Sequence, residues 1–359
     1  MTNLRAIIDK EVAGGGVITF ARFMELALYC PNFGYYERPD RIPGRKGDFY
    51  TSVSVGSLFG ELLAWQFAEW LPAIPGEAKQ IVEAGAHDGR LARDILSWLR
   101  DNRPAMWNAL EYWILEPSAQ RRASQEEMLR EFSGRVRWFP SWDAVPSGGV
   151  HGIIFSNELL DAMPVHRLGW DAARKSWFEW GVGLAGSELV WQKVQSPKSK
   201  VPTAELPEEL LAVLPEGFTT EVSPAATDWW QQAARALRNG KLLTFDYGLT
   251  AEEFFTPDRK NGTLRAYRQH HQGSDLLAHP GEQDLTAQVN FSAVQTAGER
   301  AGLTTESFIT QSVFLAKSVT AMESAGSPVT WPAAKVRQFQ TLTHPEHLGQ
   351  RFRVLVQKR

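Results

Sequence analysis

The sequence has little cysteine, no marked excess of charge and no long apolar run. Cys30 is the single cysteine among 359 residues, which excludes a disulfide within the chain and fits a reducing compartment. The formal net charge of −3 gives no reason to expect nucleic acid or an anionic membrane as a partner. With neither a signal peptide nor a bilayer-spanning segment in the sequence, we expect a cytoplasmic protein without membrane insertion.

What is present is typical of a globular protein that is large for one core. Hydrophobic residues make up 43% and charged residues 22% of the chain. From residue 80 onward, strand-like runs such as "QIVEAG", "EYWILEPS" and "HGIIFSNELLD" alternate with helical or turn patterns. This alternation predicts an α/β protein with a mostly parallel sheet. Helices are expected near residues 17–30 and 55–71, and an antiparallel hairpin near 175–194.

The stretch "QIVEAGAHDGRLARDIL" combines a strand, a turn with Gly85 and Gly89, and a helix. Such a turn lets a ligand approach the backbone and the free N–H groups of the helix start. Glu83 lies near the end of this strand. Glu116 ends the next strand, where a carboxylate can accept hydrogen bonds from a ribose. A tight turn without a ligand is the alternative interpretation.

His87 occupies the position at which a dinucleotide site keeps its middle glycine. A nucleoside without phosphates, such as S-adenosylmethionine, tolerates a side chain there more readily. Its ammonium group would gain from the carboxylates of Glu83 and Asp88. Trp142 and Asp143 follow the third strand, where the adenine would lie, although a solvated turn with a core tryptophan explains them equally well.

Several further motifs occur in order along the chain. They include "ITFARFMELALYCPNFGYY", "GDFYTS", "FGELLAWQF", "SNELLDAMPVHRL", "TEVSP", "TFDYG", "DLTAQVNFSAV" and "HPEHLGQRF". Together with the glycine turn they resemble the MidA-like methyltransferases, relatives of the mitochondrial complex I assembly arginine methyltransferase, over residues 17–352. The resemblance implies a class I, Rossmann-like methyltransferase core over residues 76–359, with a helical extension over 1–75 and insertions near 168–218 and 250–300.

The same resemblance implies S-adenosylmethionine as the cofactor and an arginine of a protein, in one relative a complex I subunit, as the methyl acceptor. It carries site residues over to matching positions. The turn residues Gly85, Ala86 and Gly89, with Glu116, match the family's cofactor turn and ribose acid. Residues expected to fold over the cofactor are Gly47, Asp48, Phe49, Thr51 and Ser52. Residues expected beside the transferred methyl group are Asn157, Glu158, Asp161, Pro164 and His166.

The chain departs from the family pattern at two places. His87 and Ala86 replace a glycine and a proline in the turn, and Val53 and Ser54 replace the Pro-Glu that usually follows "GDFxTS". The second departure removes a carboxylate and with it one potential contact to cofactor or substrate.

The chemistry of arginine methylation suggests roles for three residues. Glu158 and Asp161 could hold a guanidinium by paired hydrogen bonds and turn one nitrogen toward the methyl group. His166 could take the released proton, since a histidine ordinarily titrates near about pH 6.5. The alternatives are helix-start capping by the two acids and a structural role for the histidine.

Three other functions stay open from the sequence. They are a non-catalytic assembly factor on the same fold, a small-molecule methyltransferase of secondary metabolism, and a nicotinamide-dependent oxidoreductase, which His87 disfavours. The histidines near residues 270–279 match no zinc spacing, so no metal is expected.

Overall fold

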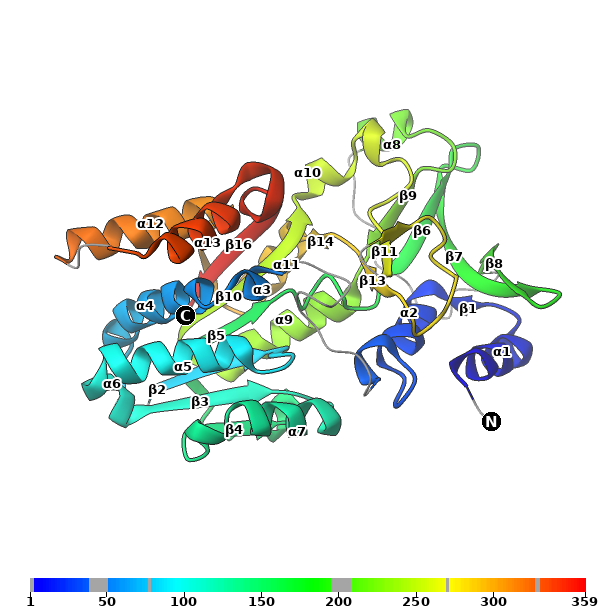
Figure 1. The fold of residues 1–359 in the computed structure, drawn as a ribbon. Helices are drawn as coiled ribbons and strands as arrows, with labels where there is room; N and C mark the ends of the chain where they lie inside the picture. Colours follow the sequence, from blue (N-terminus) through cyan, green and yellow to red (C-terminus); the bar gives the residue numbers. More distant parts are fainter. Residues whose placement is uncertain (1–2, 39–50, 77–78, 195–207, 269–270, 327–329) are drawn as a thin grey trace. The chain divides into compact units, whose positions relative to one another are not determined.

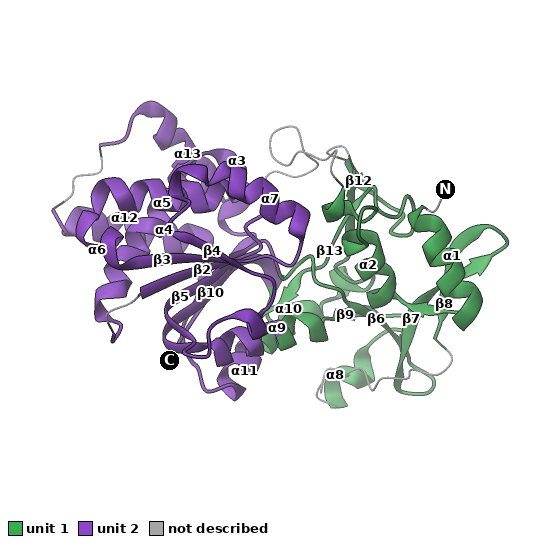
Figure 2. Cartoon of the chain, turned by 90° about the horizontal axis from the view of Figure 1, so that it is seen from below, with its two compact units in different colours: residues 1–42, 160–228, 249–294 green, residues 43–159, 229–248, 295–359 purple. Residues whose placement is uncertain are grey.

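The computed structural model describes residues 3–38, 51–76, 79–194, 208–268, 271–326 and 330–359. The chain forms two compact units, each made of three segments (Figure 2). Unit 1 contains residues 1–42, 160–228 and 249–294. Unit 2 contains residues 43–159, 229–248 and 295–359. No helix in the described ranges is long and apolar enough to cross a membrane.

Unit 2 contains a sheet with the strand order β15-β16-β10-β5-β2-β3-β4 (Figure 1). Its strands are β2 Lys79–Ala84, β3 Leu110–Leu115, β4 Val136–Phe139, β5 Val150–Asn157, β10 Leu237–Leu249, β15 Thr304–Thr310 and β16 Phe352–Lys358. The strands β10, β5, β2, β3 and β4 pair in parallel. The mostly parallel sheet predicted from the alternating pattern is therefore confirmed.

Helices pack on the two faces of this sheet (Figure 1). They are α3 Ser52–Val55, α4 Leu58–Trp70, α5 Arg90–Asn102, α6 Pro104–Ala109, α7 Ala119–Met128, α9 Pro224–Ala236, α11 Phe291–Arg300, α12 Gln311–Ser324 and α13 Ala333–Thr343. On one face, Phe59 of α4 contacts Phe245 of β10 with ring centroids 5.4 Å apart. On the other, Trp230 of α9 donates a hydrogen bond to Gln357 of β16 at 2.8 Å.

Short helical turns complete unit 2. They are η2 Leu71–Ala73, η3 Arg130–Phe132, η4 Trp142–Ala144 and the π-helical turn η6 Pro345–Gly349. The helix predicted over residues 55–71 begins only at Leu58, because Gly56 (φ 147°) separates it from α3. The run "FRVLVQKR" at residues 352–359 is an apolar pattern typical of an edge or antiparallel strand. β16 is antiparallel, but it lies between β10 and β15 rather than at an edge.

Unit 1 is built from two small sheets and the first helices of the chain. Its helices and helical turns are α1 Leu4–Gly15, α2 Phe20–Tyr29, η1 Tyr35–Glu37, α8 Glu208–Val213, α10 Ala251–Phe254 and η5 Pro257–Arg259. The strands of the two sheets are β1 Ile18–Thr19, β6 His166–Asp171, β7 Ser176–Ala185, β8 Glu188–Lys193 and β9 Thr219–Val222 in one, and β11 Arg265–Arg268, β12 His271–Gly273 and β13 Asp284–Thr286 in the other. The short strand β14 Val289–Asn290 belongs to neither.

Local sequence patterns account for several elements of unit 1. The helix expected near residues 17–30 forms as α2, and Thr19 caps it by accepting a hydrogen bond from the Arg22 N–H. The predicted hairpin forms as β7 and β8, whose strands pair antiparallel. The predicted domain boundary at residue 75 and the predicted insertions stay predictions.

Candidate active site

The turn between β2 and α5 has an unusual backbone. Gly85 (φ 74°), His87 (φ 49°) and Gly89 (φ 83°) all adopt the left-handed region. A Cβ at residue 85 would lie 2.9 Å from Cδ1 of Leu159, so the glycine allows the loop after β5 to pack against the turn. Asp88 accepts a hydrogen bond from the Arg90 N–H at 3.1 Å and forms an ion pair with the Arg90 side chain. Asp88 thus satisfies one of the free backbone N–H groups at the start of α5.

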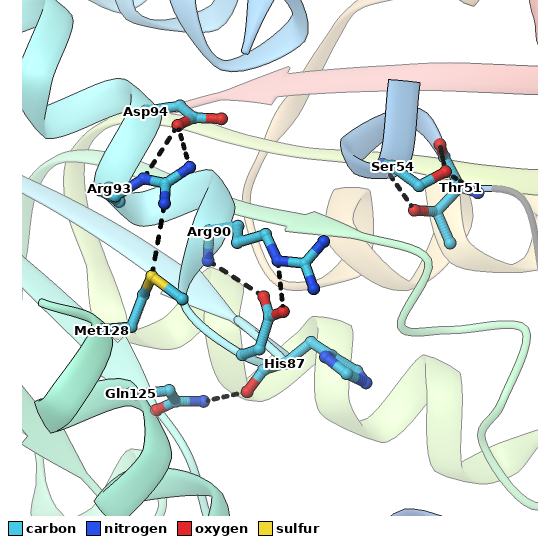
Figure 3. A network of polar contacts seen from close by, with 9 residues as sticks. Thr51, Ser54, His87, Arg90, Arg93, Asp94, Gln125 and Met128 are labelled. Carbon is cyan, nitrogen blue, oxygen red and sulfur yellow. Dashed lines mark hydrogen bonds and ion pairs between the residues drawn. The ribbon is translucent and has the colours of Figure 1, made fainter. Parts of the chain in front are cut away.

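His87 is accommodated as a neutral residue. Burial lowers the pKa of its imidazole to about 4, and the positive charges of Arg121 and Arg90 act in the same direction. The ring is therefore uncharged at neutral pH. Its backbone carbonyl accepts a hydrogen bond of 2.9 Å from Nε2 of Gln125, which Figure 3 shows beside the turn.

Glu83 lies inside unit 2 at the end of β2. Its carboxyl accepts a hydrogen bond of 2.6 Å from the Tyr112 hydroxyl. Burial raises the pKa of Glu83 to about 8, with further contributions from the negative charges of Asp88 and Asp94. The group is thus a protonated acid at neutral pH unless a cation approaches it.

Glu116 follows directly after β3 and is held by three protein donors. Its Oε1 accepts from the Ser118 N–H at 2.9 Å and from Nε of Arg121 at 3.1 Å. Its Oε2 accepts from Nε2 of Gln125 at 2.9 Å. Only 3% of the residue is exposed, so its orientation is fully determined by these partners. The sequence pattern identified Glu116 but did not predict Arg121 or Gln125, since neither belongs to a recognisable motif.

Two buried polar atoms at this edge of the sheet have no hydrogen-bond partner among the described residues. They are Nε1 of Trp142, in the turn after β4, and Oδ1 of Asn157, at the end of β5. The ring of Trp142 lies 5.6 Å from that of Trp229 in α9. Asp143 follows Trp142 in the same turn. An orphaned donor and an orphaned acceptor beyond the ends of parallel strands fit a bound polar ligand.

Glu158 adopts a left-handed backbone with φ 52°, which is costly for a residue other than glycine. Its N–H donates to the Phe245 carbonyl at 2.9 Å. The next N–H, that of Leu159, donates to Oδ2 of Asp246 at 3.2 Å. Asp246 is fully buried and also accepts from the Tyr247 N–H. Asp246 therefore helps to hold the strained loop that carries Glu158.

The carboxylate of Glu158 is also positioned within unit 2. Its Oε1 accepts from Nδ2 of Asn157 at 2.9 Å and from the Ser52 N–H at 3.3 Å. Ser52 is buried and donates through its hydroxyl to Gln311. Thr51 caps the short helix α3 and forms a reciprocal capping box with Ser54 (Figure 3). Gly47, Asp48 and Phe49 lie outside the described residues.

Asp161 and His166 belong to unit 1. Asp161 is buried, and its carbonyl accepts from the Ala287 N–H at 2.9 Å. His166 begins β6, and its Nδ1 lies 2.6 Å from Oε1 of the buried Glu179. The predicted pairing of Asp161 with Glu158 as a guanidinium clamp stays a prediction. No group of acidic residues, histidines or cysteines in the described ranges is arranged to hold a metal ion.

Together, the fold and these residues define a class of nucleoside-binding enzyme. A parallel sheet ends in a glycine turn, a strand-ending acid and buried polar atoms without a partner, and the middle position of the turn is His87 rather than the glycine of a dinucleotide site. The family model described as "Putative S-adenosyl-L-methionine-dependent methyltransferase" matches residues 62–309. The chain belongs to this family of S-adenosylmethionine-dependent methyltransferases.

Individual relatives extend the similarity to nearly the whole chain. The Drosophila melanogaster "Protein arginine methyltransferase NDUFAF7 homolog, mitochondrial" is 30% identical, with 82% of this chain and 70% of the relative covered. The Xenopus laevis NDUFAF7 protein is 27% identical, with 98% and 84% covered. A crystal structure of a "likely methyl transferase" from Burkholderia thailandensis, bound to S-adenosyl-homocysteine, matches with a TM-score of 0.82 and 30% identity over 99% of this chain and 92% of that one.

These comparisons confirm the predicted family, the Rossmann-like methyltransferase fold, the enzymatic class and S-adenosylmethionine as the cofactor. They also correct one prediction. The chain was expected to be cytoplasmic, but the curated relatives are named mitochondrial proteins, which contradicts that expectation. The sequence argument failed because a single cysteine and a lack of apolar runs do not distinguish between reducing compartments.

Proposed function

We propose that this methyltransferase transfers a methyl group to an arginine side chain of a protein. Relatives named protein arginine methyltransferases, 27–30% identical over 82–98% of this chain, support the choice of arginine. A subunit of respiratory complex I is the proposed substrate, on the family resemblance of the motifs. The single structural observation behind the proposal is the strained, anchored Glu158.

The location of Glu158 explains how it could serve such a reaction. S-adenosylmethionine supplies the methyl group from its sulfonium when it is bound. The residues proposed to hold it are the turn residues 85–89, Glu116, Asn157, and Trp142 with Asp143 at the adenine. Leu159 packs against Gly85, so the loop of Glu158 lies directly beside this turn within unit 2. A carboxylate there can pair with a guanidinium and direct one nitrogen, which is chiefly a positioning task.

Thr51 and Ser52 have a supporting role in this proposal. The Ser52 N–H donates to the Glu158 carboxylate, and the buried Gln311 holds the Ser52 hydroxyl. The carboxylate is thereby oriented before the substrate arrives, which lowers the cost of ordering it during the reaction. Asp161 remains proposed as a second carboxylate for the guanidinium. His166, whose ring is oriented by Glu179, remains proposed as the proton acceptor.

The test uses isotopically labelled S-adenosylmethionine and an extract of cells from which the gene for this protein has been deleted. The purified protein should place label on protein, and acid hydrolysis should release it as methylarginine. Glu158→Gln should lose most of this labelling, by roughly 100-fold or more, while it still binds S-adenosyl-homocysteine. Glu323→Gln, an exposed acid at the end of α12, is the matched control and should keep full activity.

Three results would overturn the proposal. Label found only in small molecules would instead identify a small-molecule methyltransferase. Absence of any transfer by a protein that binds the cofactor would instead favour a non-catalytic assembly factor. Label on a side chain other than arginine would refute the choice of acceptor and keep the enzyme class.

A further inference from the structure

The side chain of Gln125 connects three separate parts of unit 2. It comes from α7 and is fully buried. Its Nε2 donates to the His87 carbonyl and to Oε2 of Glu116, both at 2.9 Å. Its Oε1 accepts from Nε1 of Trp138 on β4 at 3.0 Å. One amide therefore joins the cofactor turn, the acid after β3 and the neighbouring strand.

The identity of the three partners determines the orientation of the amide. A backbone carbonyl and a carboxylate can only accept hydrogen bonds, whereas an indole N–H can only donate. Both N–H groups of the amide and one lone pair of its oxygen are thus used, and flipping the amide would break all three bonds. Neither glutamate nor methionine, although close in size, can satisfy the same set of partners.

The turn needs such support because its backbone is strained. His87 is a non-glycine residue at φ 49°, in a conformation that persists only when its surroundings hold it. α7 also packs directly on the turn, since a Cβ at Gly89 would lie 3.6 Å from the Cα of Gln125. The Gln125 bond to the His87 carbonyl fixes the middle of the turn from the same side (Figure 3).

We propose that Gln125 is a positioning residue for the cofactor. It fixes the position of the turn at residues 85–89, which approaches the methionine part, relative to Glu116, which faces the ribose. Its own side chain does not contact the ligand. This inference rests on the assignment of the turn and Glu116 as cofactor contacts, and it adds a residue that no motif of the chain contains.

Calorimetric titration with two ligands tests the proposal. S-adenosyl-homocysteine engages the turn and the acid, whereas 5′-methylthioadenosine lacks the amino-acid part and engages mainly the acid. Gln125→Ala should weaken S-adenosyl-homocysteine roughly 10- to 100-fold, because two buried acceptors lose their donor. It should weaken methylthioadenosine less. Gln125→Glu should weaken both ligands more, because it places a second carboxylate beside Glu116.

Two further measurements separate positioning from general stabilisation. Gln120→Ala, on an exposed position of α7, should change neither affinity by more than about twofold. In turnover, Gln125→Ala should raise KM for S-adenosylmethionine while kcat stays near the wild-type value, because the methyl acceptor is bound by other residues. A lower kcat with an unchanged KM for S-adenosylmethionine would overturn the proposal.

Trp138→Phe provides a second route if Gln125→Ala does not fold. It removes the donor to the amide oxygen together with the five-membered part of the indole, and it keeps a six-membered aromatic ring at this position. A severalfold loss of S-adenosyl-homocysteine affinity with an intact circular dichroism spectrum would support the proposal. Unchanged affinity in both folded variants would refute it. If the wild-type protein bound no S-adenosyl-homocysteine, the cofactor assignment itself would fail, and this inference with it.

Discussion

The turn between β2 and α5 shows how a residue other than glycine can adopt a glycine-like backbone conformation. His87 is not a glycine, yet with φ 49° it adopts the left-handed conformation that glycine adopts readily. Its imidazole is uncharged at physiological pH, because desolvation lowers its pKa to about 4. The hydrogen bond from Gln125 to the His87 carbonyl helps to hold this conformation.

Glu83 gives a prediction that can be tested through stability. Its carboxyl stays protonated in the folded protein up to about pH 8, whereas the unfolded chain ionises it near 4.5. The stabilisation linked to this group is complete below pH 4.5 and is lost as the pH rises toward 8. Glu83→Gln cannot ionise, so the variant should not lose stability through this group as the pH rises. Between pH 5 and pH 7, the free energy of unfolding of the ligand-free variant should rise relative to that of wild type by on the order of 2 kcal/mol.

Urea unfolding at pH 5, 6 and 7 measures this difference. Glu323→Gln, the exposed acid at the end of α12, should follow the wild-type dependence. If the unfolding free energies of Glu83→Gln and wild type differed by the same amount at all three pH values, Glu83 would have an ordinary pKa in the folded protein.

At the scale of elements, the site depends on two loops that meet at the carboxyl edge of the parallel strands. The turn after β2 and the loop after β5 come into contact through Gly85 and Leu159. Asp246, at the end of β10, adds a third element by accepting the Leu159 N–H. Adjacent parallel strands bring their ends together, so these segments share one edge although they are far apart in the sequence.

Gly85→Ala should therefore impair both the fold and the site. The methyl group would lie 2.9 Å from Leu159, on a backbone with φ 74° that disfavours any side chain. We expect a loss of roughly 1–3 kcal/mol in unfolding free energy and a more than tenfold loss of S-adenosyl-homocysteine affinity. Differential scanning fluorimetry and calorimetry measure the two effects.

Gly134→Ala is the matched control, because no atom lies within 4 Å of the added methyl group. It should leave melting temperature and affinity nearly unchanged. Equal behaviour of the two alanine variants would show that the close approach of Leu159 does not constrain the turn.

At the scale of the whole molecule, the chain passes repeatedly between the two units, and its last strand completes the sheet of unit 2. β16 pairs with β10 over residues 241–247 and with β15 on its other side. Phe352, Val354 and Val356 of this strand are buried in the core. Neither unit is a continuous piece of sequence, so stability depends on segments from both ends of the chain.

A chain shortened to residues 1–349 should consequently fail to form the sheet. It would lose the hydrogen-bonded partner of two strands together with a row of buried side chains. Soluble yield and the far-ultraviolet circular dichroism spectrum report the outcome. Arg351→Ala, an exposed residue just before β16, should behave as wild type. A shortened chain that is soluble and binds S-adenosyl-homocysteine would show that β16 is dispensable.

The sequence alone determined the alternation of strands and helices, the glycine turn, the acid after β3 and the family. These features depend on local spacing and on short motifs, which remain readable along the chain. Tertiary structure alone decided which residues support them. Gln125 reaches His87 across 38 positions, and Ser52 reaches Glu158 across 106. Hydrogen bonds between such distant residues have no periodicity in the sequence, because only the folded sheet brings their partners within reach.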